Sequence, residues 1–154
     1  MIKGNELRIG NYVMASRYRS NKLFLTQVET LSKSWTDLGY TLVLNDKFVA
    51  TGENFGSCLE KEVMPINLTQ EWLINFGFKL NKDTSIWHLG CYQIFEDELG
   101  FFYFCLFRLG EWHHHIEYAH TLQNLYFCIT NGEELTISEE MIMEFNKKIS
   151  TIKK

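Results

Sequence analysis

The chain has 154 residues, of which 45% are hydrophobic and 22% are charged, and its formal net charge is −4. This balance excludes intrinsic disorder, and the length suffices for a core without disulfides or a structural metal. The negative charge argues against bulk electrostatic binding of nucleic acid, which requires clustered lysine and arginine. We expect either one compact unit or two lobes, a β lobe at 1–64 and an α+β lobe at 65–154.

The sequence gives no indication of export or of membrane insertion. Lys3, Glu6 and Arg8 interrupt any apolar leader, and no apolar run is long enough to span a bilayer. The cysteines lack a C-x-x-C spacing, so we interpret them as small buried hydrophobic residues in a reducing compartment. They are Cys58, Cys91, Cys105 and Cys128. We therefore expect a cytoplasmic protein.

The N-terminal half has the pattern of a small antiparallel sheet. Strands are predicted over Leu7 to Ala15, with a turn or bulge at Gly10-Asn11, and over Phe24 to Leu31 and Tyr40 to Leu44. Short strands at this spacing favour a curled sheet such as an SH3-like barrel. The segment from Ala50 to Glu62 is predicted to be a loop. It lacks the G-K-[ST] of a phosphate-binding loop, and we expect no cofactor.

After Pro65, the sequence predicts a helix, a β meander and two further helices, which makes the fold class α+β. Thr69 is the expected N-cap of a helix from Gln70 to Phe76, which Gly77 ends. Four strands follow, over Phe78 to Leu80, Ser85 to Leu89, Tyr92 to Phe95 and Phe101 to Arg108. The last is apolar on both faces, which predicts a central strand covered on both sides. The expected covers are a helix beginning at Ile116 and a final helix from Glu139 to about Ile149.

These two covering helices have different surfaces. The final helix begins after Ser138 and is expected to bury Met141, Ile142, Phe145 and Ile149. The stretch from Ile116 to Leu135 is predicted to be one amphipathic helix, stopped by Asn131-Gly132. Its apolar face comprises Tyr118, Ala119, Leu122, Leu125, Tyr126 and Ile129. On the opposite side lie Glu117, His120 and Asn124, with Phe127 beside them. This polar stripe is a recognition surface, ordinary solvated helix, or an anchor to the N-terminal lobe.

Two clusters of residues offer chemistry. His113, His115, Glu117 and His120 could ligate a metal ion in a metal-dependent hydrolase, because imidazole is the commonest zinc ligand. The competing interpretation is a solvated loop, since adjacent histidines point in different directions. The chain has no G-x-S-x-G elbow and no cysteine in an activating context, so we assign no catalytic residue.

The second cluster is basic and aromatic. Arg17, Tyr18 and Arg19 follow the first predicted strand, where guanidinium groups could hold a phosphate and the ring could stack on a base. An ordinary solvent-facing hairpin loop has the same composition. Both interpretations stay open.

Three stretches together resemble a family of small uncharacterised proteins of gut anaerobic bacteria and their phages and prophages. They are Asn5 to Val13, Leu68 to Leu73 with Phe76 to Phe78, and His120 to Phe127 with Gly132 to Leu135. The resemblance carries no established activity, but it implies a mobile-element setting inside a bacterial host cell. Small proteins in that setting often inhibit host defence or sequester a signal.

The leading hypothesis is therefore a non-enzymatic binding protein that takes up a host protein or a nucleotide-like ligand. A nucleotide would use Arg17 or Arg19 with Tyr18, whereas a protein would use the polar stripe and Phe127. The alternatives are the metal-dependent hydrolase and a structural or virion protein that self-associates as a homo-oligomer.

Overall fold

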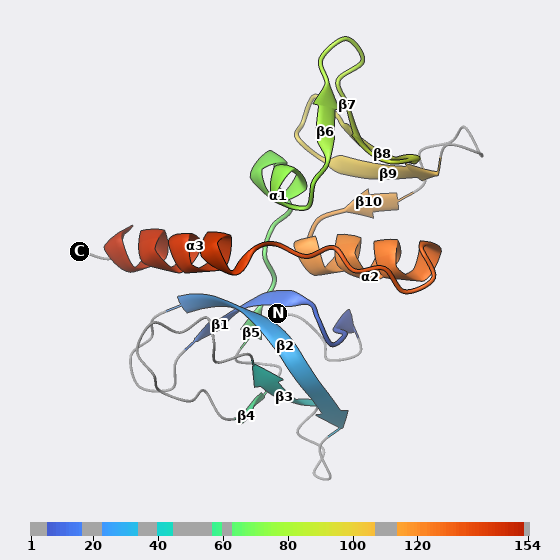
Figure 1. Cartoon of the computed structure of the whole chain (residues 1–154). Coiled ribbons are helices and arrows are strands. Elements are labelled where there is room, and N and C mark those ends of the chain that lie inside the picture. The colour runs from blue at the N-terminus through green and yellow to red at the C-terminus, as the bar shows by residue number, and fades with distance from the viewer. Residues whose placement is uncertain are drawn as a thin grey trace.

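The computed structural model describes residues 6–16, 23–33, 40–44, 57–59, 63–106 and 114–152. In this part of the chain the fold is α+β, as predicted, with helices lying between two antiparallel sheets (Figure 1). The first sheet contains β1 (Tyr12–Ser16), β2 (Leu23–Lys33), β3 (Tyr40–Leu44), β4 (Ser57–Leu59) and β5 (Val63–Met64). The second contains β6 (Lys79–Asn81), β7 (Ile86–Leu89), β8 (Tyr92–Glu96), β9 (Phe102–Leu106) and β10 (His114–Ile116). The helices are α1 (Gln70–Asn75), α2 (Ala119–Ile129) and α3 (Glu139–Ile152).

The first sheet has the strand order β4-β3-β2-β1-β5. The long β2 pairs with β1 through its first half and with β3 through its second half, and its register shifts between Val28 and Thr30. A bulge of this kind bends a strand, so it lets one long strand pair with β1 and with β3 in the same curved sheet. β4 lies within the segment predicted to be a loop. This prediction was wrong there, because Ser57–Leu59 pairs with β3.

β1 separates two buried clusters. Val13 and Ala15 belong to the interior of the first sheet, whereas Tyr12, one residue earlier, belongs to the main core with the helices and the second sheet. Successive side chains of a strand point to opposite faces, so both faces of β1 are covered. Because Leu25 of β2 joins the same main core, the two sheets share apolar packing.

The second sheet has the order β10-β9-β8-β7-β6, in which β9 lies between two neighbours as predicted. The meander was predicted with four strands, and the fifth, β10, falls in the histidine segment interpreted as a loop. Its polar residues hide the strand in the sequence, but they pair with β9, with His115 opposite Tyr103. The predicted helical cover on both faces of β9 was wrong, because α3 packs mainly against β2 of the first sheet.

α1 follows its local signals. The Thr69 hydroxyl accepts a hydrogen bond from the backbone N–H of Trp72, which satisfies one of the free amides of the first turn. Trp72 and Leu73 are buried in the main core. Gly77 has a φ of +89° directly after the last turn, a conformation that glycine adopts without strain. The predicted cap and stop are confirmed, and the helix ends one residue earlier than predicted, at Asn75.

α2 is shorter than predicted at both ends. Residues 117–119 pair in extended form with residues 66–68, because the Leu68 N–H donates to the Glu117 carbonyl and the Ala119 N–H to the Ile66 carbonyl. Extended pairing uses these backbone groups, so the helix begins at Ala119 rather than at Ile116. It ends at Ile129, and the positive φ angles of Asn131 and Gly132 confirm the predicted stop.

α3 begins at the predicted cap, where the Ser138 hydroxyl accepts from the Met141 N–H. Ile142 is fully buried, but Met141 is 42% exposed, so its predicted burial was wrong. The Asn146 side chain joins α3 to β2, accepting from the Leu25 N–H at 2.6 Å and donating to the Leu25 carbonyl at 3.0 Å. α3 therefore serves as a layer between the sheets and not as a cover for the meander alone (Figure 1).

Two further expectations concern the burial of the cysteines and the lack of a membrane-spanning segment. Cys105 is buried, as predicted, whereas Cys91 and Cys128 are exposed free thiols and contradict the prediction. The Cys58 side chain lies outside the described residues. Within the described ranges, none of the helices combines the length and the apolar character that a membrane span requires.

Candidate functional site

The surface of α2 that faces the first sheet is polar, and Gln123 is its centre. This side chain is 1% exposed. Its Oε1 accepts from the Tyr12 N–H at 2.9 Å, and its Nε2 donates to the Gly10 carbonyl at 3.1 Å and to the Leu135 carbonyl at 2.9 Å. Both amide N–H groups and the amide oxygen are therefore used to fix α2 against β1 and the loop before α3.

Asn124 continues this contact one residue further along α2. Its Oδ1 accepts from Nδ2 of the buried Asn11 at 2.9 Å, and its Nδ2 donates to the Glu6 carbonyl at 2.8 Å. Asn11 in turn accepts from the Arg8 N–H through its own side chain. Of the three interpretations of the polar stripe, anchoring to the N-terminal segment therefore describes Asn124.

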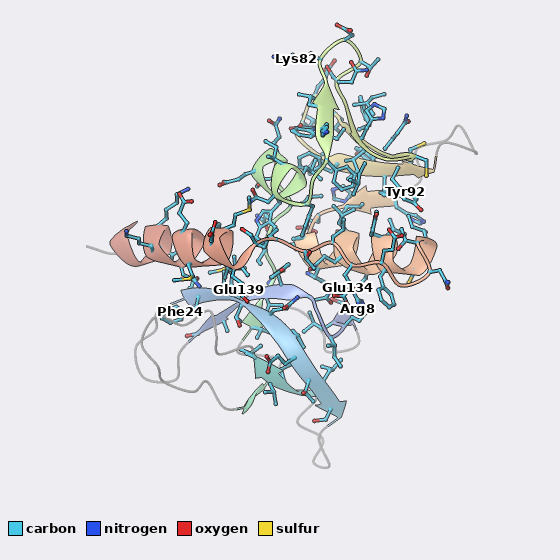
Figure 2. The ribbon with its side chains drawn as sticks, viewed as in Figure 1. Arg8, Phe24, Lys82, Tyr92, Glu134 and Glu139 are labelled. Carbon is cyan, nitrogen blue, oxygen red and sulfur yellow. The ribbon has the colours of Figure 1, made fainter. Side chains whose placement is uncertain are left out.

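Phe127 also contacts the N-terminal segment. The Arg8 guanidinium lies 3.8 Å from the centre of the Phe127 ring, and its Nη1 donates to Glu134 at 3.1 Å. Figure 2 shows Arg8 and Glu134 side by side beneath α2. A stacked guanidinium covers this ring, so Phe127 is part of the junction between the lobes.

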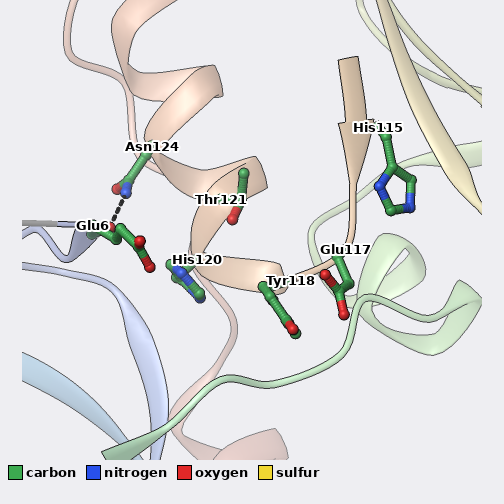
Figure 3. A pocket seen from close by; sticks show the side chains of 7 residues that line it. All are labelled: Glu6, His115, Glu117, Tyr118, His120, Thr121 and Asn124. Carbon is green, nitrogen blue, oxygen red and sulfur yellow. Dashed lines mark hydrogen bonds between the residues drawn. The ribbon is translucent and has the colours of Figure 1, made fainter. Parts of the chain in front are cut away.

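A cleft of about 460 Å³ opens beside this junction, between the N-terminal segment, β10 and the first turn of α2. It is lined by Glu6, His115, Glu117, Tyr118, His120, Thr121 and Asn124. We call these seven residues the acidic cleft, because its described lining has two carboxylates and neither lysine nor arginine. In Figure 3, Glu6 and Glu117 lie on opposite sides of the Tyr118 and His120 rings.

The two rings in the acidic cleft are stacked. Their centres are 5.6 Å apart and their planes differ by 9°. Burial lowers the pKa of His120, and the charge of Glu6 opposes this shift only partly, so the imidazole is neutral at neutral pH. His120 is 2% exposed, and its Nδ1 has no hydrogen-bond partner among the described residues.

The carboxylates act on the same pair of rings. The pKa of the Tyr118 hydroxyl is raised, first by a hydrogen bond to Glu117, then by burial and by the charges of Glu117 and Glu6. Both acidic side chains thus place negative potential at the stacked rings. A negative site with aromatic faces attracts a cation and repels a phosphate.

The acidic cleft brings together only part of the predicted site. It contains Glu117, His120 and Asn124 of the polar stripe. Phe127 is not part of the cleft, because its ring stacks against the guanidinium of Arg8. Arg17, Tyr18 and Arg19 lie outside the described residues, as does His113 of the predicted metal cluster.

His115, Glu117 and His120 of that cluster all line the acidic cleft. However, in the described ranges no three histidine, cysteine or acidic side chains are placed to hold a metal ion together. The geometry therefore lends the hydrolase hypothesis no support.

Sequence reasoning missed Gln123 and Arg8 as contacts and Glu6 as part of the cleft. The signal for Gln123 was present, since it lies four residues after Ala119 and three before Tyr126, on the buried side of the helix. No local pattern could identify Arg8 or Glu6, because Arg8 meets Phe127 and Glu6 meets Asn124 more than one hundred residues away in the chain.

Comparison with known proteins found no matching family model, no matching curated protein and no matching solved structure. The resemblance described for the sequence therefore stays an expectation.

Proposed function

We propose that this chain is a non-enzymatic binding protein that recognises a cationic group in the acidic cleft. One observation carries the proposal: Glu6 and Glu117 flank a stacked pair of rings, beside a buried imidazole nitrogen that has no hydrogen-bond partner in the described part of the chain. A guanidinium or ammonium group would donate to the carboxylates and lie against the Tyr118 face.

The charge of the acidic cleft separates the two ligand classes considered from the sequence. A nucleotide signal carries phosphates, which the two carboxylates would repel, so the acidic cleft does not suit a nucleotide. A protein partner with a basic side chain complements the cleft. The resemblance to phage and prophage proteins adds a setting to this proposal, namely binding of a host protein in the bacterial cytoplasm.

The test uses agmatine, a small guanidinium compound, as the probe. We expect agmatine to shift the amide NMR signals of residues 117–121 in a saturable manner. Glu117→Gln should weaken this binding about tenfold, because it removes a charge-assisted hydrogen bond worth about 1.5 kcal/mol. Glu98→Gln, at an exposed turn of the second sheet, is the matched control and should leave the affinity unchanged.

Two results would contradict the proposal. The first is an absence of saturable shifts at residues 117–121 when agmatine is added. The second is equal weakening by Glu117→Gln and Glu98→Gln, which would indicate a general effect of net charge and not a site.

A further inference from the structure

The acidic cleft continues into an aromatic surface on the second sheet. His115 belongs to both, because it lines the cleft and its ring also meets Phe101 edge-on at 5.1 Å and Tyr103 at 5.7 Å. We call Phe101, Tyr103 and His115 the aromatic ridge. β10, which carries His115, is the outermost strand of its sheet in the described chain and contacts α2, so the ridge and the cleft meet at this edge of the sheet.

The turn before β9 holds the aromatic ridge in a fixed form. Asp97 Oδ1 accepts from the backbone N–H groups of Leu99 and Phe101, both at 2.9 Å, and Oδ2 accepts from the Tyr103 hydroxyl at 3.2 Å. These bonds lower the pKa of Asp97, the Phe101 N–H contributing most. The turn presents Phe101 with 45% of its surface exposed and the neighbouring Leu99 with 80%. Exposed rings on a preorganised turn contribute to binding with little loss of conformational entropy.

Charge and shape together indicate one kind of occupant. The acidic cleft takes a cation, and the adjoining ridge takes an apolar group, so the complementary ligand carries both a short distance apart. A small cation would fill the cleft and leave the ridge unused, whereas a polypeptide has basic and apolar side chains on one backbone. The parallel rings of Tyr118 and His120 favour a planar guanidinium over the compact ammonium of lysine.

We infer that the acidic cleft and the aromatic ridge form one interface for a basic segment of a partner protein, with an arginine in the cleft and an apolar side chain on Phe101. The inference rests on the proposed function, since it requires that the cleft bind a cation. Beyond the proposed function, the inference specifies that the partner is a polypeptide and that it also contacts the aromatic ridge outside the cleft.

The test compares short capped peptides on the full chain by isothermal titration calorimetry. One set pairs arginine with tryptophan at separations of one to three residues, and the matched set has glycine in place of tryptophan. At the best separation, we expect the tryptophan peptide to bind about tenfold more tightly than its glycine counterpart, as a well-packed aromatic contact contributes more than about 1 kcal/mol. Replacing arginine by lysine should weaken binding.

Three variants identify which residues bind the tryptophan and the arginine of the peptide. Phe101→Ala should remove the tryptophan advantage and leave the affinity for the glycine peptide unchanged. Leu80→Ala is the matched control, because Leu80 is 42% exposed on β6, the opposite edge of the same sheet. It should preserve the advantage. Glu117→Gln should weaken both peptides equally.

The outcomes separate this inference from the proposed function. If agmatine and the glycine peptide bind but tryptophan adds nothing, or adds the same in Phe101→Ala, the polypeptide interface is wrong and the cation site stands. If neither agmatine nor any peptide binds, both fail together. If a single-stranded oligonucleotide binds with dependence on Phe101, the ridge stacks bases and the partner class is wrong.

Discussion

Replacing Gln123 by Met should destabilise the protein by about 3 kcal/mol. Methionine has a similar length and helix propensity, so the substitution removes hydrogen bonds with little change in volume. The Tyr12 N–H and the Leu135 carbonyl lose their bonds to Gln123, and each stranded buried group costs about 1–3 kcal/mol. The Gly10 carbonyl keeps a bond from Gln27 Nε2 at 2.9 Å, so it adds little to the loss.

The control is Gln27→Met, which removes an amide that donates to the same Gly10 carbonyl. That carbonyl then retains Gln123 Nε2, so the free energy of unfolding should fall by less than about 1 kcal/mol. Urea denaturation followed by circular dichroism measures both variants. In thermal unfolding, the loss in Gln123→Met corresponds to a Tm about 6–12 °C lower. Equal stability of the two variants would refute the assignment of Gln123 as the anchor of α2.

Three further predictions test the contacts between the layers. Arg8→Met should lower the free energy of unfolding by about 1–2 kcal/mol, since it removes the stack on Phe127; a thermal scan that matches wild type would contradict this role. Asn146→Leu should cost about 1–3 kcal/mol in urea, because both backbone groups of Leu25 lose a partner, and an unchanged midpoint would show that α3 is held otherwise. The lowered pKa of His120 means that the unfolded chain takes up the proton first, so stability falls as the pH drops below about 6.5. His120→Phe should reduce the difference between the urea midpoints measured at mildly acidic and at neutral pH. An unchanged difference would show that other groups cause the pH dependence of stability.

Local signals predicted the elements whose geometry depends on a few neighbouring residues. α1 needs only a hydroxyl at its N-cap and a glycine at its end, and Thr69 and Gly77 supply both. The Asn131-Gly132 stop of α2 is equally local, because the left-handed conformation ends a helix wherever it occurs. β3 was predicted with its observed bounds, since its alternating β-branched residues suit a strand with partners on both sides.

β10 shows where such reasoning fails. His114–Ile116 has no apolar alternation, and three residues form a strand there only because β9 supplies hydrogen bonds. The start of α2 has the same cause, since the helical periodicity extends to Ile116 but residues 66–68 use the backbone groups of residues 117–119. Pairing with distant segments leaves no trace in a local pattern.

The sequence by itself determined the α+β class, the two antiparallel sheets, and the residues from which α2 builds its polar and apolar sides. Only the tertiary structure decided what those sides face. Helical periodicity assigns one apolar face, but α2 lies between two sheets, so its buried arc extends to include His120 and Gln123 as well as Leu122. Buried polar groups usually require hydrogen bonds, and Gln123 finds them on the backbone of Tyr12, Gly10 and Leu135. The same placement leaves the acidic cleft open at the end of α2, where the N-terminal segment and β10 meet its first turn.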